Sequence, residues 1–291
     1  MKKVPVRVDG RELVLSNLDK ILYPEEGFTK AEVIDYYSRV APLLLPHLRD
    51  RPLTVKRYPN GVEGAFFFEK NAPEHTPGWV RTVRLPAPGS TKNRETIDFA
   101  VVDDLPTLVY YANLAALELH VPQWRVSQDG QALPPDTLVF DLDPGPPATI
   151  VECCEVALTL REVLRVEGLT ALPKTSGNKG MQLYASWDCR EEPSAYARRL
   201  AQLLEKEHPD QVVSVMAKKA RPGKVFIDWS QNNPAKTTVA PYSLRARQRP
   251  TVSTPLLWEE VESCEHPDDL VFTAADVLAR AEEHGDLFAR A

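Results

Sequence analysis

The spacing of apolar residues predicts four helices along the chain. Thr29 followed by Glu32 is a capping-box pattern that marks the start of the first helix. Pro42 is expected to kink or shorten that helix, and Ser194 is expected to cap the last one. The four helices are expected at about residues 29–50, 105–118, 149–166 and 194–207.

Short apolar runs between these helices predict strands. Strands and helices alternate, but without the regular spacing of a doubly wound parallel fold. We therefore expect an α+β fold with mixed or antiparallel sheets. From about residue 258 the chain is expected to be helical and peripheral. The expected strands are 52–57, 137–143, 181–186, 212–216 and 224–229.

One of these strands carries the clearest chemical signal. Side chains on a strand alternate between its faces, so Leu138, Phe140 and Leu142 are expected in the core. Asp141 and Asp143 then lie side by side on the opposite face. Two neighbouring carboxylates repel each other unless a cation compensates, and oxygen ligands suit Mg²⁺ or Mn²⁺. The alternative is that one aspartate caps a turn and the other is solvated.

A third aspartate, Asp228, closes the apolar strand predicted at 224–229. If this strand lies beside that of Asp141 and Asp143, the three carboxylates complete a site for two metal ions. Such a pair of ions can hold the attacking and leaving oxygens of an in-line phosphoryl transfer. The alternative role of Asp228 is to start a turn, which is common for aspartate.

The segment Lys174–Gly180 has the composition of a phosphate-binding loop. Its glycines let backbone N–H groups converge on an anion, and Ser176 and Lys179 add a donor and a charge. The spacing of a Walker A loop is absent, so a glycine-rich hairpin turn is the alternative interpretation.

Cationic and amide side chains on both sides of Asp228 also fit triphosphate binding, although several are expected to be plain surface residues. Taken alone, His120 favours a structural role. The run of three aromatic residues Phe66–Phe68 is typical of a hydrophobic core, and the alternative is that one ring stacks on a nucleic-acid base. The side chains that flank Asp228 are Arg221, Lys224, Gln231, Lys236, Arg245 and Arg247.

The charge distribution supports a phosphate-binding face. The net charge of −6 argues mildly against a nucleic-acid partner. However, residues 250–291 hold ten acids and two bases, whereas 217–249 hold eight Lys or Arg and one acid. A local basic face can hold phosphates on an acidic chain.

The sequence contains no apolar run of about 18 residues and no apolar signal segment, so a cytoplasmic protein is expected. Four cysteines without a C-x-x-C pair indicate neither a zinc site nor a disulfide framework.

Several motifs occur together and carry a resemblance to a known family. They are N-L-D-K ending at Lys20 with Thr29-Lys30, K-R-Y-P-N-G from Lys56, F-F-E-K from Phe67, H-V-P-Q-W from His120, F-D-L-D-P-G from Phe140, T-S-G-N-K-G from Thr175, D-W-S-Q-N from Asp228 and A-P-Y-S-L-R ending at Arg245. In this combination the chain resembles the polymerase domain of bacterial ligase D and its stand-alone relatives. These are primase-polymerases of the archaeo-eukaryotic primase superfamily, and the resemblance spans about residues 6–288.

The resemblance implies an RNA-recognition-like catalytic sheet with flanking helices and an N-terminal α/β portion. Residues 1–291 are expected to form a single primase-polymerase domain. Within it, 6–125 would contact a 5′-phosphate and the template, 126–250 would form the catalytic core, and 251–291 would form an acidic helical tail.

The resemblance also implies roles for individual residues. The region of His120 is associated in the family with sensing the ribose 2′-hydroxyl, which changes the interpretation made from this residue alone. The matched positions are Asp141, Asp143 and Asp228 for the metal ions; His120, Ser176, Lys179, Arg221, Gln231 and Arg245 for the nucleotide; Lys20 and Lys30 for the DNA 5′-phosphate; and Lys56 and Phe68 for the template region.

The implied function is that of a template-directed repair polymerase acting in non-homologous end joining. It would add nucleotides, preferably ribonucleotides, to 3′ ends at gaps or double-strand breaks, using NTP or dNTP and two Mn²⁺ or Mg²⁺ ions. The implied partners are DNA with a gap, overhang or 5′-phosphorylated end, with Ku and an ATP-dependent DNA ligase as further candidates, in a nucleoid-associated bacterial setting without a membrane.

Three alternatives stay open. The chain could be a gap-filling polymerase of excision repair or a primase, because the active site would be the same. It could also be a catalytically weak 5′-phosphate end-binding module that recruits Ku or a ligase, although retained carboxylates argue against this. A two-metal nuclease is a further alternative, but it needs no triphosphate pocket. Whether the chain is a whole protein or one domain of a ligase is also open.

The chain departs from the family pattern in two places. After Gly180 the family has an apolar residue and then His, where this chain has Met181 and Gln182. Gln182 is therefore expected to remove a possible positive charge, with an effect on rate or metal preference. The segment 86–95 is longer than in some relatives and is expected to be an exposed loop that could contact the partner strand.

Overall fold

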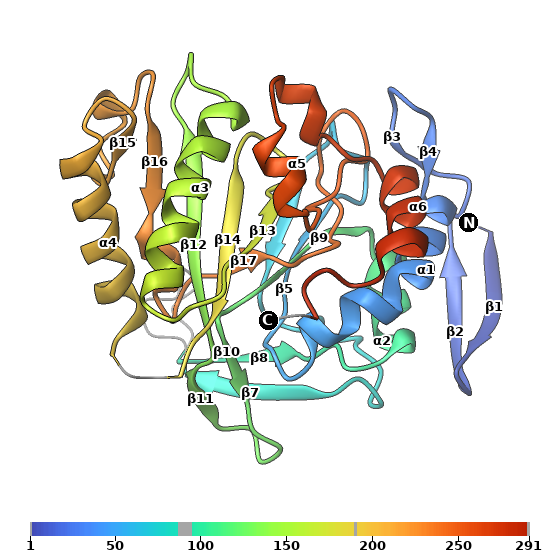
Figure 1. The fold of residues 1–291 in the computed structure, drawn as a ribbon. Helices are drawn as coiled ribbons and strands as arrows, with labels where there is room; N and C mark the ends of the chain where they lie inside the picture. Colours follow the sequence, from blue (N-terminus) through green and yellow to red (C-terminus); the bar gives the residue numbers. More distant parts are fainter. Residues whose placement is uncertain (1, 87–94, 189–190, 290–291) are drawn as a thin grey trace.

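A five-stranded mixed sheet contains the strand with the paired aspartates (Figure 1). The computed structural model describes residues 2–86, 95–188 and 191–289. Every strand pair in this sheet is antiparallel except β15 with β16. The predicted strand at 212–216 is shorter than expected. In spatial order, the strands are β13 (Leu172–Thr175), β14 (Met181–Ser186), β12 (Thr137–Pro144), β16 (Val225–Asp228) and β15 (Val212–Val213).

Helices α3 (Ile150–Val166) and α4 (Pro193–Glu207) cover one face of this sheet (Figure 1). The alternation in β12 is confirmed, because Leu138, Phe140 and Leu142 all lie in the core between sheet and helices. The predicted cap at Ser194 is wrong. Instead, the Glu192 side chain accepts a hydrogen bond from the Ala195 amide, and Pro193 stands at the first helical position, where it loses no backbone hydrogen bond.

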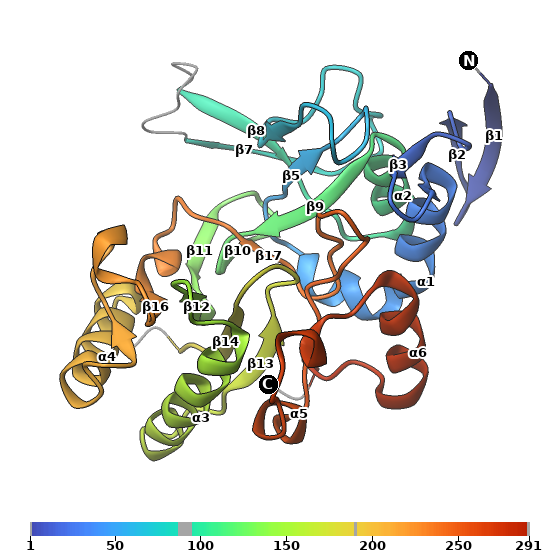
Figure 2. The same cartoon turned by 90° about the horizontal axis from the view of Figure 1, so that it is seen from above.

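A four-stranded sheet forms the second half of the molecule, with α1 (Lys30–Leu48) and α2 (Leu105–Asn113) packed around it. The capping box predicted for α1 is confirmed, but Pro42 does not end that helix. In the view from above, β17 lies between the other strands of this sheet and the five-stranded sheet (Figure 2). The strand order is β17 (Thr238–Val239), β9 (Ala116–Val121), β5 (Thr54–Arg57) and β6 (Phe67–Glu69).

The helix predicted at 105–118 is too long. It ends at Asn113, Ala115 adopts a positive φ of 58°, and β9 begins one residue later. From there Leu117 and Leu119 face the core, whereas Glu118 and His120 face the other side of the strand. The prediction failed because an apolar run does not distinguish a helix from a fully buried strand.

Short hairpins and turns complete the fold. Each of the four remaining strand pairs is antiparallel. The segment 87–94, which holds most of the loop predicted at 86–95, lies outside the described residues. The pairs are β1 (Lys3–Val8) with β2 (Arg11–Ser16), β3 (Ile21–Tyr23) with β4 (Phe28–Thr29), β7 (Thr82–Pro86) with β8 (Thr96–Ala100), and β10 (Trp124–Val126) with β11 (Ala132–Pro135); the 3₁₀ turns are η1 (Lys218–Ala220), η2 (Trp229–Asn232) and η3 (Pro267–Leu270).

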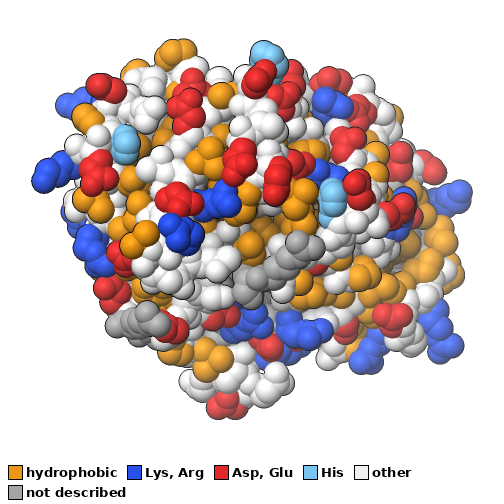
Figure 3. Space-filling model, viewed as in Figure 1, with side chains coloured by type: hydrophobic (Ala, Val, Ile, Leu, Met, Phe, Trp, Pro, Cys, Tyr) orange, Lys and Arg blue, Asp and Glu red, His pale blue; other side chains and the backbone are white. Residues whose placement is uncertain are grey.

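The C-terminal segment is more than a peripheral tail. It contains α5 (Trp258–Glu262) and α6 (Ala274–His284). Val252 and Val277 are buried in the core of the four-stranded half, and Leu256 in that of the five-stranded half. Most of its acidic side chains stay at the surface and gather on the face where α5 and α6 lie (Figure 3). This segment therefore ties the two halves together and presents an acidic face that would repel DNA phosphates.

The α+β prediction is confirmed. Among the described residues, no helix is long and apolar enough to cross a membrane.

Candidate active site

The three predicted metal ligands lie on two adjacent strands. Asp141 on β12 is the direct cross-strand neighbour of Asp228 on β16, and Asp143 follows two residues later on the same face of β12. All three side chains are partly buried. The register therefore supplies the neighbouring strand that the sequence analysis had only supposed.

The surroundings of the aspartates neutralise their charge only in part, through the ion pair of Lys236 Nζ with Asp228 Oδ2 at 3.6 Å. Burial, and then the charge of Asp143, raise the pKa of Asp141 to about 7. Burial and the charge of Asp228 likewise raise the pKa of Asp143. The Asp143 carboxylate accepts no hydrogen bond from the described part of the chain. Three clustered carboxyl groups, two of them with raised pKa values, fit a binding site for hard divalent cations.

One side-chain amide bridges two of the carboxylates. The Gln231 Nε2 atom donates to Asp228 Oδ2 at 3.2 Å and approaches Asp141 Oδ2 at 3.4 Å. Within the described ranges, no three His, Cys, Asp or Glu side chains are already drawn together to hold a metal ion. Cation binding at these aspartates would therefore need small side-chain movements around Gln231.

Gln182, which replaces the family histidine, contacts Asp141 directly. Its Nε2 atom donates to Asp141 Oδ1 at 3.0 Å. Its Oε1 atom accepts a hydrogen bond from the fully buried Lys174 Nζ at 2.5 Å, and Lys174 also donates to Ser253 Oγ at 2.5 Å. Because Lys174 Nζ donates to Gln182 Oε1, the Nε2 end of the amide is the one that faces Asp141. Burial, and then the charge of Arg245, lower the pKa of Lys174 well below its usual value.

The predicted phosphate loop is the hairpin turn between β13 and β14, which confirms the alternative interpretation of this segment, and its phosphate-binding role stays a prediction. Ser176 Oγ accepts hydrogen bonds from the amides of Asn178 and Gly180, each at 3.3 Å. Gly177 has a φ of +65°, and a Cβ there would lie 2.7 Å from Arg245 Cγ. Glycine therefore lets the loop approach Arg245, while the Lys179 side chain stays exposed.

A cavity of about 440 Å³ borders the phosphate loop between the start of α3 and η3. Lys179 and Asn178 line it together with apolar side chains such as Ile150 and Phe272. None of the three aspartates lines this cavity, so it is separate from the candidate metal site.

Two arginines carry buried donors that form no hydrogen bond within the described part of the chain. The Nε atoms of Arg221 and Arg245 are buried and form no hydrogen bond to the described residues. The Arg221 guanidinium lies 3.7 Å from the centroid of the Phe226 ring, and its Nη2 atom donates to the Met216 carbonyl at 2.9 Å. Buried donors without partners are costly, and an anion would satisfy them.

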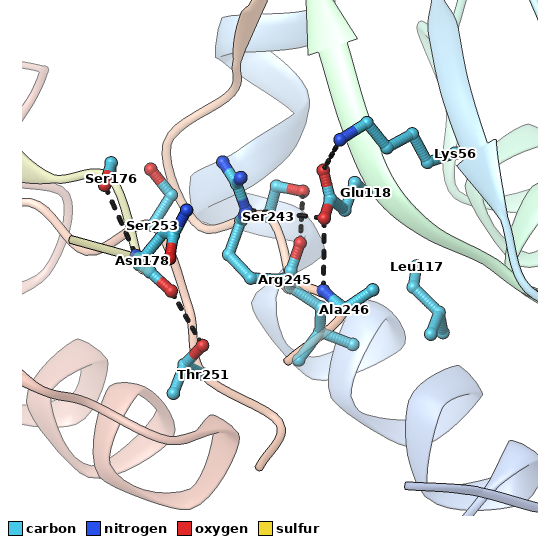
Figure 4. Close-up of polar contacts among 12 residues, drawn as sticks. Lys56, Leu117, Glu118, Ser176, Asn178, Ser243, Arg245, Ala246, Thr251 and Ser253 are labelled. Atoms are coloured by element: carbon cyan, nitrogen blue, oxygen red, sulfur yellow. Dashed lines mark hydrogen bonds and ion pairs between the residues drawn. The ribbon is translucent and has the colours of Figure 1, made fainter. Parts of the chain in front are cut away.

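Arg245 connects the two halves of the site. Its Nε atom lies 3.5 Å from Glu118 Oε1 on β9, and its aliphatic stem lies beside Gly177 of the phosphate loop (Figure 4). Glu118 in turn lies 2.9 Å from His120 Nε2 and 3.2 Å from Lys56 Nζ. The Phe68 ring packs edge-on against His120, with centroids 6.4 Å apart. Residues predicted for nucleotide and template thus form one connected group.

Lys20 and Lys30 lie together at the start of α1. The Lys30 amide donates to the Lys20 carbonyl at 2.8 Å. The Lys30 ammonium is almost buried and donates to the Ser16 carbonyl at 2.6 Å, and Lys20 Nζ donates to Asn60 Oδ1 at 2.9 Å. Burial, and then the charges of Lys20 and Arg57, lower the pKa of Lys30 to about 8. Neither lysine forms an ion pair with a carboxylate of the described residues, and two such cations suit an anionic ligand.

The sequence analysis missed Glu118 and Lys174. Both are buried charged side chains that touch predicted site residues. The alternation of Leu117, Glu118, Leu119 and His120 was an available signal for a strand with a polar face.

Comparison with known proteins identifies the family. The family model described as "LigD, primase-polymerase domain" matches residues 29–288. The chain is 44% identical over 94% of its length to the multifunctional non-homologous end joining protein LigD of Mycolicibacterium smegmatis, of which it covers 35%. It is 33% identical over 94% of its length to the bifunctional LigD of Bacillus subtilis, of which it covers 43%.

A solved structure agrees with these relatives. The polymerase domain from Mycobacterium tuberculosis ligase D in complex with DNA matches with a TM-score of 0.89 and 41% identity, over 96% of this chain and 97% of that one. The chain thus spans about a third to two fifths of the curated relatives it matches, but nearly all of the isolated domain. It therefore belongs to the LigD primase-polymerase domain family, a family of metal-dependent nucleotidyltransferases.

Proposed function

We propose that this chain is a template-directed repair polymerase that extends 3′ ends at gaps or double-strand breaks in non-homologous end joining, with ribonucleotides preferred. Residues 1–291 would act as a single primase-polymerase domain. The observation that carries this proposal is the cross-strand pair Asp141 and Asp228, together with two arginines whose buried Nε atoms form no hydrogen bond to the described residues. Such a site offers oxygen ligands to cations and cationic donors to a triphosphate, which is what nucleotide addition requires.

The residues have distinct roles in this proposal. Asp141, Asp143 and Asp228 would hold Mn²⁺ or Mg²⁺, whose chemistry lowers the pKa of the primer 3′-hydroxyl and stabilises the leaving pyrophosphate. Arg245 and Arg221 would orient the triphosphate through their guanidinium groups, whose Nε atoms form no hydrogen bond to the described residues. The nucleotide site would also include His120, Ser176, Lys179 and Gln231; Lys56 and Phe68 would contact the template region, and Lys20 and Lys30 the DNA 5′-phosphate.

Primer extension on a gapped duplex with a 5′-phosphate tests the proposal. Ribonucleotides and deoxyribonucleotides would be compared in Mn²⁺ and in Mg²⁺. Template-directed addition, more efficient with ribonucleotides, is the expected result. Absence of addition with either metal, together with tight binding that depends on the 5′-phosphate, would show that the chain is an end-binding module instead.

Recognition of the 5′-phosphate is expected to weaken as the pH rises through about 8. Below that pH Lys30 is charged, and above it Lys30 loses its proton, whereas the phosphate stays a dianion across this range. Binding a dianion raises the pKa of Lys30, so the loss should extend toward pH 9. The measurement is the ratio of affinities for 5′-phosphorylated and 5′-hydroxyl gapped duplexes from about pH 7 to 9. A constant ratio would contradict the role of Lys30.

Replacing Lys174 with methionine is expected to slow extension by about tenfold or more. Methionine keeps the length of the side chain but leaves Gln182 Oε1 and Ser253 Oγ without their donor. The Gln182 amide is then free to turn away from Asp141. The measurement is the single-turnover rate of nucleotide addition, with Lys206→Met on the exposed side of α4 as the control. A wild-type rate for Lys174→Met would exclude this contribution.

A further inference from the structure

The polar face of β9 places Glu118 and His120 next to each other. They are two residues apart on a strand whose other face, with Leu117 and Leu119, lies in the core. Lys56 on β5 is the cross-strand neighbour of Glu118. Glu118 and His120 are both buried, although they belong to residue types that usually stay exposed or need partners inside a protein.

The Glu118 carboxylate has four neighbouring donors, and Figure 4 shows its contacts with Lys56, Arg245 and Ala246. Its Oε2 atom lies 2.9 Å from His120 Nε2 and 3.2 Å from Lys56 Nζ. Its Oε1 atom accepts a hydrogen bond from the Ala246 amide at 3.2 Å and lies 3.5 Å from Arg245 Nε. Glu118 is thus the shared counter-ion of two cations and the hydrogen-bond partner of one imidazole.

This environment determines the protonation of both partners. Burial opposes ionisation of Glu118, but the hydrogen bond with His120 and the charges of Arg245, His120 and Lys56 outweigh it, and hold the pKa of Glu118 well below its usual range. Burial lowers the pKa of His120, and the contact with Glu118 opposes this without reversing it. At neutral pH an ionised carboxylate therefore faces a neutral imidazole.

An ionised carboxylate can only accept hydrogen bonds, so the proton of the neutral ring must be on Nε2. The Nδ1 atom then carries a lone pair and is an acceptor. No hydrogen bond joins Nδ1 to another described residue. This atom is thus left for a ligand that has a hydroxyl or N–H donor.

We propose that Glu118 is a positioning residue for sugar selection, which holds His120 as the Nε2–H tautomer and leaves Nδ1 to accept a hydrogen bond from the 2′-hydroxyl of an incoming ribonucleotide. This inference rests on the proposed function. A deoxyribonucleotide has no such donor and leaves the Nδ1 lone pair without a partner. Glu118 itself touches neither the sugar nor the phosphates and acts through His120.

The tautomer can be measured on the unmodified protein without any catalysis. Two-bond ¹H–¹⁵N NMR correlations of protein with ¹⁵N-labelled histidine distinguish protonated from unprotonated ring nitrogens, and His120→Gln identifies the signals of His120. The expected result is a neutral ring with the proton on Nε2. A neutral ring with the proton on Nδ1, or a doubly protonated ring at neutral pH, would overturn the proposal.

The second test is the Glu118→Gln variant, which keeps the shape of the side chain but not the charge. Its selectivity is the kcat/KM for a ribonucleotide divided by that for the matching deoxyribonucleotide. The variant also loses the charge that faces Arg245. Any resulting change in triphosphate binding affects both substrates alike, so it cancels in this ratio. The expected result is a drop of about tenfold, the effect of one hydrogen bond, with loss of the single tautomer in the NMR spectrum.

Lys56→Met is the matched control, because it removes another partner of Glu118 that does not touch His120. It is expected to affect both sugars alike and to leave the tautomer unchanged. An unchanged ratio in Glu118→Gln, with ribonucleotides still preferred by the wild type, would overturn the role of Glu118. If no nucleotide is added at all, the proposed function fails, whereas the tautomer measurement still reports on His120.

Discussion

Replacing Asp141 with asparagine is expected to reduce nucleotide addition by about a thousandfold or more and to make the protein more stable. The carboxylate is a proposed cation ligand, and cations supply several kcal/mol of transition-state stabilisation, which corresponds to about three orders of magnitude in rate. Stability changes in the opposite direction, because burial and the charge of Asp143 raise the pKa of Asp141 to about 7. Ionisation of such a group opposes folding.

The sign of the stability effect depends on pH. A carboxyl whose pKa is higher in the folded than in the unfolded protein favours folding in its protonated form, and this contribution is lost as the pH rises through the folded pKa. The gain from asparagine should therefore be absent below about pH 4 and complete above about pH 7. Thermal unfolding with a chelator at several pH values measures it. A variant that loses activity because it is less stable at pH 8 would show that Asp141 has a structural role instead.

The position of the aspartates illustrates what a sequence can predict. The alternation of Leu138, Phe140 and Leu142 with Asp141 identified the strand and its two faces, because a strand with one buried face repeats every two residues. The turn after Asp143 and the apolar run that ends at Asp228 were equally local signals. Local patterns of this kind predicted most elements of the five-stranded sheet.

The contacts that orient these residues were not predictable in the same way. Lys174 reaches Gln182 eight positions away and Ser253 seventy-nine positions away, and only the assembled sheet brings the three together. Glu118 was hidden for another reason. Its strand follows an apolar helix after a turn at Ala115, and the alternation from Leu117 to His120 is too short to stand out against the apolar run before it. A buried polar residue that only orients another site residue produces no recognisable motif in the local sequence.

The C-terminal segment shows a third limit. Its ten acids and two bases indicated a solvated tail, and most of its acidic side chains are indeed at the surface. Its few apolar residues, such as Val252 and Leu256, are nevertheless buried in different cores. Net charge describes the exposed face of such a segment and says little about the face that packs.

Replacing Arg245 with glutamine is expected to raise the KM for the nucleotide by about ten- to a hundredfold while leaving DNA affinity unchanged. Its guanidinium forms no hydrogen bond to the described residues, although it is largely buried between Glu118 and the phosphate loop. A charge-assisted hydrogen bond to a triphosphate contributes about 1.5–3 kcal/mol, which gives this range. Arg245→Lys should recover only part of the loss, because an ammonium lacks the planar fork that binds two phosphate oxygens.

The control for Arg245 is Arg39→Gln on α1, where an exposed arginine pairs loosely with Asp35 at 3.9 Å and Glu282 at 3.7 Å. Exposed pairs of this kind contribute little, so this variant should match the wild type. Steady-state extension with varied nucleotide gives the KM, and DNA binding is measured without nucleotide. If Arg245→Gln instead weakens DNA binding and leaves the KM unchanged, the open guanidinium serves the DNA backbone. The triphosphate would then have to be held by Arg221 and the loop that contains Ser176 and Lys179.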